Sequence, residues 1–348
     1  MTIPVTVLGA TGLVGQVFCE RLAGHPLFQI ETLVAGPESA GLPYAEAVRW
    51  RRPAGVPGEV ANLRLVSTPE RLTTQVAFSG LSPGAAARLE GPYAEDGAWV
   101  FTNAGHHRMD PDVPLVIPEI NGDHLALAPA QDRSGAIVAN PNCTTVGLAL
   151  AIAPLVARFG VGAARVVSLQ ARSGAGLQAG EIMELEDDLI PFIPGEAVKM
   201  ASELPKILGR WHPGGALVPA DVTVQATCMR VPVTHGHTLC VDVTLGAAAS
   251  EEEMRAAWRT YSGLEGAADL PSAPHPLIHV ADGPEHPRPG GHRDRGQGLA
   301  ISVGPPAPLD AGGRRWTFTT LSHNLVRGAA GGAILTAEDA HRRGLLDG

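Results

Sequence analysis

The first residues of the chain pass from a short apolar run to a glycine-rich segment and then to an amphipathic one. Val5, Val7 and Leu8 form an apolar run of strand length, and "GATGLVG" (9–15) follows directly. Beyond these glycines, apolar side chains recur at helical spacing as far as Leu22. This order predicts a buried strand, a tight glycine turn and a helix.

The alternation of strand and helix patterns continues to about residue 140. Three further apolar runs end in small residues: "FQIETLVAG" (28–36), "QVAFSGLS" (75–82) and "AWVFTNAG" (98–105). "AIVAN" (136–140) is predicted to be the last strand of this domain. Such alternation predicts a parallel sheet, which binds ligands at the carboxyl ends of its strands. The glycine turn lets backbone N–H groups and a helix N-terminus approach a pyrophosphate. We therefore predict a Rossmann-type dinucleotide-binding domain over residues 1–142.

The pattern changes after residue 142. An apolar helix is expected over "TTVGLALAIAPLVARF", ending at Gly160. Three predicted strands follow, two of them with alternating apolar residues: "ARVVSLQAR" (164–172), "VTVQATCMRVPV" (222–233) and "HTLCVDVTLG" (237–246). Residues 143–321 are therefore predicted to form an α+β catalytic and dimerisation domain with a mixed sheet, within an α/β protein.

Two later segments complete this prediction. "ADGPEHPRPGGHRDRGQG" (281–298) is rich in proline, glycine and charge, which is typical of a surface loop. The tail "HNLVRGAAGGAILTAEDAHRRG" has a helical pattern. We expect this C-terminal helix, at about 322–348, to pack back on the first domain.

Composition narrows the class of protein. A chain of 348 residues with 45% hydrophobic and 18% charged residues predicts a globular protein of two domains. A formal charge of -9 argues against nonspecific nucleic-acid or anionic-membrane binding, and no run is apolar enough to span a bilayer. The start "MTIPVTVLGA" lacks the basic segment of a signal peptide, and four scattered cysteines fit neither a metal site nor a disulfide framework. We expect a cytoplasmic protein with a small-molecule substrate.

One cysteine stands where a strand pattern gives way to a helix pattern. In "NPNCTT", Pro141 and Asn142 end the strand, so the Cys143 thiol is predicted at a helix N-terminus. That position favours the reactive thiolate, and its free N–H groups are candidates to bind an oxyanion. A buried structural cysteine is the alternative that this stretch leaves open.

Charged residues elsewhere supply candidate partners for the thiolate. In "RVPVTHGHT", Arg230 can hold a carboxylate and His237 can exchange a proton, with His235 as a rival histidine. Glu196 and Lys199 share a helix face in "GEAVKM", either as a binding pair or as a solvated ion pair. Arg108, which follows a strand end, is another candidate anion ligand. Only two of the 26 Lys+Arg are lysines, Lys199 and Lys206.

A dinucleotide domain, a thiolate, an acid/base and anion ligands together favour one reaction class. The thiolate attacks an activated acyl group to give a thioester, which hydride then reduces to an aldehyde.

The sequence resembles the aspartate-semialdehyde dehydrogenases, in particular their archaeal and fungal branch. The resemblance runs nearly end to end. It rests on motifs that occur in the family's order: "GATGLVG", "NAGHHRMDPDVPLVIPEIN", "VANPNCTT", "QARSGAG", "GEAVKMASELPKILG", "RVPVTHGHT" and "HNLVRGAAGG". It implies the NADPH-dependent reduction of L-aspartyl 4-phosphate to aspartate semialdehyde, on the route to lysine, threonine and methionine, by a homodimer or homotetramer.

The resemblance also implies a role for individual residues. Cys143 would be the nucleophile, His237 the acid/base and Gln170 the residue that positions the acyl-enzyme. Arg230 would bind the α-carboxylate, Glu196 the ammonium, and Lys199, Arg108 and Asn142 the phosphate. The cofactor would contact Gly9, Thr11, Gly12, Leu13, Val14, Gly15, Glu38, Ser39, Ser79, Ser173, Gly174 and Asn324. No metal ion is implied.

One departure from the family concerns the cofactor. Where the family usually has an arginine and a lysine after the second strand, this chain has Glu38 and Leu42 in "PESAGLP". A carboxylate repels a 2′-phosphate but can hydrogen-bond a free 2′-hydroxyl. We therefore expect a weakened preference for NADP and use of NAD, unless Ser39 or an arginine such as Arg49 compensates.

Other readings are kept as alternatives. N-acetyl-glutamyl-phosphate reductase usually has a different cysteine motif and needs no partner such as Glu196 for an ammonium group. Glyceraldehyde-3-phosphate dehydrogenase differs in the motifs around its Cys-Thr-Thr. A malonyl-CoA reductase would keep Cys143 and His237 but relax the amino-group contact. A regulator that binds NAD(P) without turnover predicts an unreactive Cys143.

Overall fold

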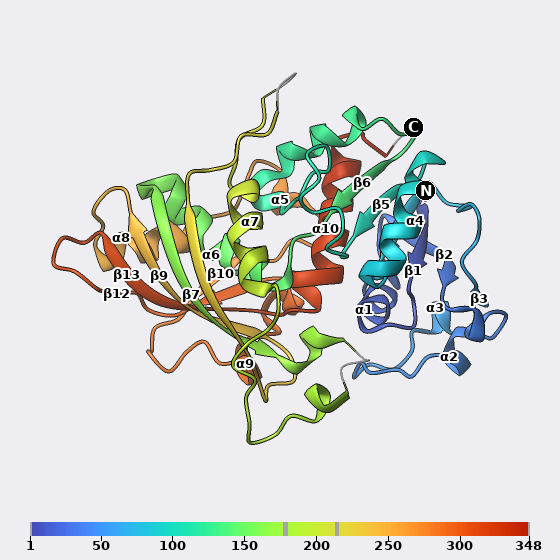
Figure 1. Cartoon of the computed structure of the whole chain (residues 1–348), viewed down its shortest axis with the longest axis horizontal. Coiled ribbons are helices and arrows are strands. Elements are labelled where there is room, and N and C mark those ends of the chain that lie inside the picture. Colours follow the sequence, from blue (N-terminus) through green and yellow to red (C-terminus); the bar gives the residue numbers. More distant parts are fainter. Residues whose placement is uncertain (1, 177–179, 213–215, 347–348) are drawn as a thin grey trace. The chain divides into compact units, whose positions relative to one another are not determined.

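The computed structural model describes residues 2–176, 180–212 and 216–346. It consists of two compact units (Figure 1). The first combines Met1–Val116, Asp123–Asn140 and Ala329–Gly348, and the second combines Ile117–Gly122 and Pro141–Gly328. Within the described ranges, no helix has the length and apolar character needed to cross a membrane.

The first unit contains a six-stranded parallel sheet in the order β3-β2-β1-β4-β5-β6. Its strands are β1 Ile3–Leu8, β2 Phe28–Val34, β3 Leu65–Val66, β4 Val76–Ser79, β5 Trp99–Thr102 and β6 Ala136–Ala139. The chain builds outward from β1 in one direction and then from β4 in the other. The carboxyl ends of β1 and β4 thus flank the switch point where open sheets of this kind bind ligands. The predicted Rossmann-type parallel sheet is confirmed.

Helices and short helical turns complete the first unit. They are α1 Leu13–Leu22, η1 Pro37–Ser39, α2 Tyr44–Ala47, α3 Gly58–Ala61, α4 Pro83–Glu95, α10 Gly331–Arg342 and most of η2 Gly122–Ala130. Residues 331–340 of α10 are all buried. α10 packs against α1 and β5, and Glu338 accepts a hydrogen bond of 2.9 Å from His25 Nε2. The last described helix is therefore an integral part of the N-terminal sheet domain.

The second unit contains a mixed seven-stranded sheet in the order β10-β11-β13-β9-β7-β8, with β12 beside β13. Its strands are β7 Val161–Ala171, β8 Thr223–Val231, β9 His237–Leu245, β10 Ile278–Val280, β11 Ile301–Val303, β12 Ala307–Pro308 and β13 Arg315–Ser322. β7 and β8 are parallel, whereas β9 runs antiparallel to both β7 and β13. The predicted mixed sheet is confirmed.

Helices pack on this sheet because their apolar faces match its buried positions. The helices and turns are α5 Pro118–Asn121, α6 Cys143–Phe159, η3 Arg172–Ala175, η4 Gly180–Glu184, α7 Glu196–Ile207, α8 Glu251–Arg259, η5 Ala267–Asp269, α9 Pro289–His292 and η6 Arg295–Gly298. α6 is buried along most of its length and contacts β7, β9 and β13. The segment 281–298, expected to be a loop, contains the two short turns α9 and η6, because a short turn needs no long apolar periodicity.

Candidate active site

One edge of the mixed sheet gathers several polar side chains. Gln170 near the end of β7 lies opposite Arg230 near the end of β8. Because β9 is antiparallel to β7, its first residue, His237, lies at the same edge. All three side chains are buried. The sequence separates these residues by up to 67 positions, and strand direction alone brings them together.

Cys143 is the first residue of α6, as predicted, and Asn142 is its N-cap. Asn142 Oδ1 accepts hydrogen bonds from the Thr144 N–H at 3.0 Å and the Thr145 N–H at 3.4 Å. The expectation that these N–H groups bind an oxyanion is therefore wrong for Thr144 and Thr145, because the cap already occupies them. The cap fixes the start of the helix and so the direction of the thiol.

The Cys143 thiol contacts His237. Cys143 Sγ lies 3.2 Å from His237 Nε2, and the Ala171 N–H donates to His237 Nδ1 at 3.0 Å. Since Nδ1 is an acceptor, the proton of the neutral ring is on Nε2 and points at the sulfur. Burial, and then the Arg230 charge, lower the pKa of His237 from 6.5 to about 3, against the opposing effect of Glu196. A neutral imidazole therefore donates to the sulfur atom.

The rival histidine, His235, has different partners. His235 Nδ1 lies 2.9 Å from Ser173 Oγ, which also accepts from Asn324 Nδ2 at 2.9 Å. Asn324 Oδ1 in turn accepts from the Gly236 N–H at 2.9 Å. This network stabilises the turn before His237. His237 therefore contacts the Cys143 sulfur, whereas His235 contacts Ser173 and supports the turn.

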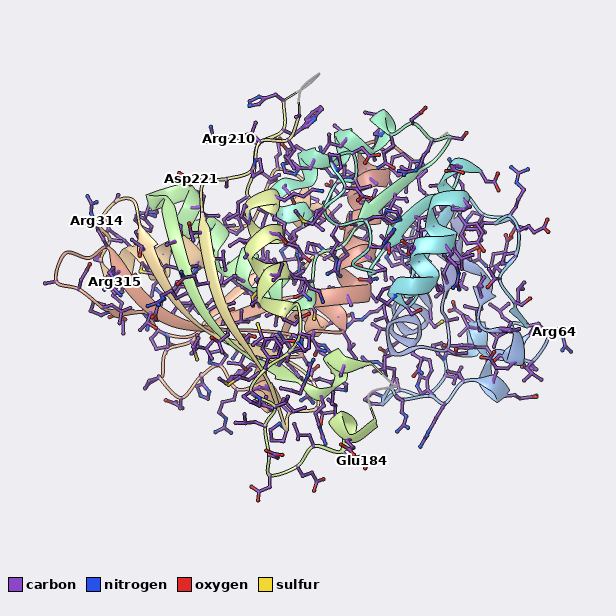
Figure 2. All side chains as sticks on the ribbon, in the orientation of Figure 1. Arg64, Glu184, Arg210, Asp221, Arg314 and Arg315 are labelled. Atoms are coloured by element: carbon purple, nitrogen blue, oxygen red, sulfur yellow. The ribbon has the colours of Figure 1, made fainter. Side chains whose placement is uncertain are left out.

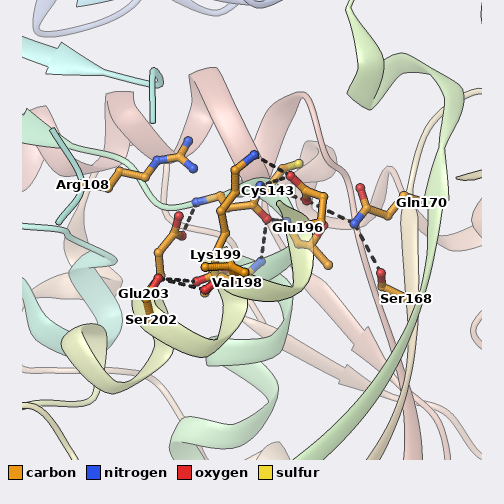
Figure 3. A network of polar contacts seen from close by, with 12 residues as sticks. Arg108, Cys143, Ser168, Gln170, Glu196, Val198, Lys199, Ser202 and Glu203 are labelled. Carbon is orange, nitrogen blue, oxygen red and sulfur yellow. Dashed lines mark hydrogen bonds and ion pairs between the residues drawn. The ribbon is translucent and has the colours of Figure 1, made fainter. Parts of the chain in front are cut away.

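Glu196, the first residue of α7, is the hub of a polar network (Figure 3). Its carboxylate accepts from Lys199 Nζ at 2.7 Å, from Asn142 Nδ2 at 3.1 Å and from Gln170 Nε2 at 3.2 Å. Burial opposes ionisation, but Lys199 and the Gln170 and Asn142 amides outweigh it and hold the pKa of Glu196 below its ordinary value. Glu196 and Lys199 thus form an ion pair, but Glu196 is 7% exposed and not part of a solvated surface.

Two residues of this network were not singled out from the sequence. Glu203, about two helical turns beyond Glu196 on α7, accepts from the Asn142 N–H at 2.7 Å. Ser168 accepts from Gln170 Nε2 at 3.3 Å. Glu203 lies in "GEAVKMASELPKILG" and Ser168 in the predicted strand "ARVVSLQAR". The sequence signal available for both was therefore their place on the buried face of a helix or strand. Lys206, the second lysine, is also buried on α7.

Arg230 faces this site with unused hydrogen-bonding capacity. Its Nη1 donates to the Ala171 carbonyl at 2.8 Å. A Cβ added to Gly174 would lie 2.7 Å from Arg230 Nη1 and 3.0 Å from His237 Cε1, so a side chain there would displace the Arg230 guanidinium. Within the described ranges, Nε of Arg230 is buried with no hydrogen-bond partner. A buried guanidinium with a spare donor is suited to a carboxylate ligand.

In the first unit, the glycine turn after β1 forms a close-packed backbone cradle. Gly9 has φ +74°, and a Cβ on Gly15 would lie 2.2 Å from the Gly9 carbonyl oxygen. Gly12 is the N-cap of α1 and gives it no side-chain cap, and Thr11, Leu13 and Val14 complete the segment. The helix N-terminus is thus bare backbone, which fits a dinucleotide pyrophosphate.

Two further predicted ligands lie at the carboxyl ends of neighbouring strands. Ser79 Oγ donates to Glu90 Oε1 at 2.6 Å. Arg108 donates to the Asn140 carbonyl at 3.0 Å and to the Asn103 carbonyl at 2.7 Å, beyond the ends of β6 and β5. Arg108 is therefore anchored at the edge of the parallel sheet where ligands bind.

Glu38 lies in the short turn η1 that follows β2. A Cβ on Gly36 would lie 2.3 Å from Glu38 Oε1, so the carboxylate covers the Gly36 backbone. Ser39 donates its N–H to the Gly36 carbonyl in the same turn. Arg64, which projects from this unit in Figure 2, donates to the nearby Gly41 carbonyl at 2.6 Å. The turn after β2 thus presents the carboxylate of Glu38 beside the Gly36 backbone.

In the part of the chain that the structure describes, no group of three or more His, Cys, Asp or Glu side chains could hold a metal ion. The four cysteines are free thiols.

Comparison with known proteins connects these two units to one family. Residues 4–128 match the semialdehyde dehydrogenase NAD-binding domain, and residues 152–327 match the semialdehyde dehydrogenase dimerisation domain. An aspartate-semialdehyde dehydrogenase of Archaeoglobus fulgidus is 41% identical over 97% of this chain and 98% of its own. One from Trichophyton rubrum is 37% identical over 98% of this chain and 97% of its own.

A solved structure agrees with the sequence comparisons. The aspartate-semialdehyde dehydrogenase of Candida albicans, determined with NADP, superposes with a TM-score of 0.88 at 34% identity and covers 99% of this chain and 100% of its own. Family models, relatives and fold therefore agree along nearly the whole sequence. The chain belongs to the aspartate-semialdehyde dehydrogenase family.

Proposed function

We propose that this protein reduces L-aspartyl 4-phosphate to L-aspartate 4-semialdehyde and phosphate through a thioester on Cys143. The observation that carries the proposal is the 3.2 Å contact of Cys143 Sγ with His237 Nε2, at the start of α6. Family membership supports the choice of substrate, since relatives that match along nearly the whole chain are named aspartate-semialdehyde dehydrogenase.

In the first half-reaction, the Cys143 thiolate attacks the acyl carbon. A C–S bond forms, the C–O bond to phosphate breaks, and inorganic phosphate leaves and takes up a proton from water. The helix N-terminus and the His237 Nε2–H both stabilise the thiolate before the attack. Because Nδ1 already accepts the Ala171 N–H, His237 serves as a donor, which is the acid side of its predicted role.

In the second half-reaction, the thioester carbon is reduced. A bound nicotinamide dinucleotide supplies the hydride. The resulting negative charge on oxygen is stabilised by hydrogen bonding from the His237 Nε2–H. The C–S bond then breaks as the aldehyde carbonyl forms, and this regenerates the Cys143 thiolate.

Substrate recognition is assigned by charge. Arg230 binds the α-carboxylate through its spare donors, and Glu196 binds the ammonium. Lys199, which is half-exposed, and Arg108 neutralise the phosphate. Asn142 has its side chain committed to the helix cap and to Glu196, so we assign it to positioning and leave the phosphate to the two cations. Gln170 would orient the acyl group from the same network.

For the cofactor, we propose that the pyrophosphate of a nicotinamide dinucleotide binds at the cradle of Gly9, Gly12 and Gly15, with substantial use of NAD. The bare N-terminus of α1 supports pyrophosphate binding, and Glu38 on the Gly36 backbone opposes a 2′-phosphate. Arg64, which donates to the Gly41 carbonyl in this loop, carries a positive charge that would partly offset the repulsion between Glu38 and a 2′-phosphate. Ser173, Gly174 and Asn324, which adjoin the His237 turn, remain predicted contacts of the nicotinamide end.

We further propose that the chain forms a homodimer, or a dimer of dimers, through the mixed sheet. Among the residues that the structure describes, one face of this sheet carries exposed side chains. Arg165, Val167, Cys240 and Asp242 lie there in register across β7 and β9. Arg315, which Figure 2 labels, begins the neighbouring strand β13 opposite Thr244. The match of residues 152–327 to a dimerisation domain supports this face. A cytoplasmic location remains a prediction from the cysteine pattern.

The test is the phosphate-dependent oxidation of aspartate semialdehyde, with NADP and NAD in parallel. Turnover is expected to require phosphate and to fall by at least ~10³-fold in Cys143→Ala, because no thioester can form. Cys228→Ala is the matched control, as another cysteine of the same unit, and should keep most activity. Turnover of malonyl-CoA in place of the semialdehyde, or equal activity in Cys143→Ala, would contradict the proposal.

A further inference from the structure

Gly328 presses directly on the nucleophile from outside its helix. A Cβ added to Gly328 would lie 2.7 Å from Cys143 Cβ, 2.8 Å from Cys143 Cα and 3.0 Å from its carbonyl oxygen. The Gly328 N–H donates to the His323 carbonyl at 3.0 Å. The Gly328 backbone, within the turn Val326–Ala330, is therefore a surface against which Cys143 rests.

The residue before Gly328 is a buried arginine with a bidentate partner. Arg327 Nη1 donates to Glu119 Oε1 at 2.8 Å, and Nη2 donates to Glu119 Oε2 at 2.7 Å. Arg327 is 1% exposed and Glu119 is 2% exposed. The two residues are 208 positions apart in the sequence, so the pair ties distant segments of the second unit together.

Glu119 is itself held in place by backbone contacts. Its carbonyl accepts from the Leu264 N–H at 3.0 Å and from Tyr261 Oη at 3.0 Å. A Cβ on Gly263 would lie 2.6 Å from Glu119 Cβ, so this loop packs on the residue without a gap. The carboxylate thus stands on α5 as a fixed support for the guanidinium.

We propose that Glu119 and Arg327 are positioning residues that set the Cys143 sulfur through Gly328. Neither side chain is placed at the reacting atoms. Their ion pair fixes the Val326–Ala330 turn, and Gly328 then holds the first residue of α6 within reach of His237 Nε2. A lysine at 327 keeps the charge but loses the bidentate geometry, so it should let the turn shift.

The readout is the pH dependence of Cys143 alkylation by iodoacetamide, followed by mass spectrometry of the Cys143 peptide. Displacing the sulfur from the helix N-terminus and from the His237 donor should disfavour the thiolate. In Arg327→Lys, the alkylation midpoint should rise by at least half a pH unit. In the semialdehyde assay, kcat should fall at least tenfold while KM changes less than twofold.

Two further variants keep the test decisive. Arg327→Met combined with Glu119→Gln removes both charges and so leaves no unpaired buried ion, and it should show the same rise in midpoint. Arg255→Lys is the matched control, since Arg255 is buried in the same unit and donates to the Ala281 carbonyl at 3.1 Å. It should lose stability without moving the alkylation midpoint.

The kcat part of this inference rests on the proposed function, whereas the alkylation part does not. An unchanged midpoint in both Arg327 variants overturns the inference, whatever happens to their stability. A shifted midpoint in protein that turns over no semialdehyde supports the positioning role and refutes the proposed substrate.

Discussion

His237 is a buried imidazole whose neighbours fix its proton and keep it neutral. Its pKa of about 3 in the folded chain lies below the value of 6.5 expected in the unfolded chain. Between these values the unfolded chain binds a proton that the folded chain does not. Stability should therefore rise with pH across this window and fall as the pH drops from 6.5 toward 3.

The first prediction follows from this titration. Between pH 6.5 and pH 5, His237 should contribute a loss of roughly 2 kcal/mol in the free energy of unfolding, measured by urea titration. His237→Gln removes the group, so its stability should fall by less over the same interval. His212→Gln, at an exposed site, is the control. Parallel pH profiles for His237→Gln and the parent protein would contradict a buried neutral His237.

The second prediction concerns Glu38. Replacing Glu38 by arginine removes a repulsion and adds an ion-pairing partner for a 2′-phosphate, so the ratio of kcat/KM for NADPH over NADH should rise at least about tenfold, or about 1.4 kcal/mol. Glu46→Arg makes the same charge change on the exposed side of α2 and should leave the ratio within about twofold. A parent enzyme that already prefers NADPH by several orders of magnitude would refute the role of Glu38.

At the scale of elements, the turn between β1 and α1 depends on two glycines for different reasons. A methyl group on Gly15 meets backbone atoms at 2.2 Å and 2.7 Å, whereas on Gly12 it meets only the Gly9 oxygen, at 3.3 Å. Gly15→Ala should therefore destabilise the protein by about 3 kcal/mol, the upper end of overpacking effects. Gly12→Ala should stay folded but bind the cofactor more weakly, because its methyl group occupies the cradle.

Thermal unfolding and calorimetric titration with NAD(P) distinguish these two outcomes. Gly84→Ala, where the added methyl group meets nothing within 4 Å, is the control for both measurements. Equal cofactor affinity in Gly12→Ala and the parent protein would place the pyrophosphate elsewhere.

The strands and long helices could be predicted because each carries an apolar run or a periodic face of its own. The start of α6 at Cys143 is an example, since a turn-forming Asn-Pro-Asn precedes a long apolar stretch. Asn142 is a preferred N-cap residue for this helix, but its hydrogen bond to Glu196 could not be predicted, because it depends on how α7 packs beside α6. The pairing of Glu119 with Arg327 left no periodic signal, since its partners lie 208 positions apart.

At the scale of the whole molecule, the exposed sheet face should control assembly. Val167 is 39% exposed on β7, opposite Cys240. An aspartate at 167 would bury an unpaired charge in the proposed dimer, so Val167→Asp should run as a monomer in light scattering while keeping its far-UV circular dichroism. Leu42→Asp, an exposed apolar residue of the first unit, should stay a dimer. A Val167→Asp dimer would move the interface to another surface.

The first unit combines segments from both ends of the chain, and this has a consequence for how the protein is synthesised. Its sheet is complete by Ala139, yet α10, which packs on β5 and is buried through residues 331–340, is translated only after all of the second unit. The first unit therefore cannot close until the segments of the second unit have been translated, and the face of β5 that α10 covers lacks this partner in the meantime. Until α10 is made, the nascent N-terminal half exposes an apolar strand face of the kind that chaperones bind.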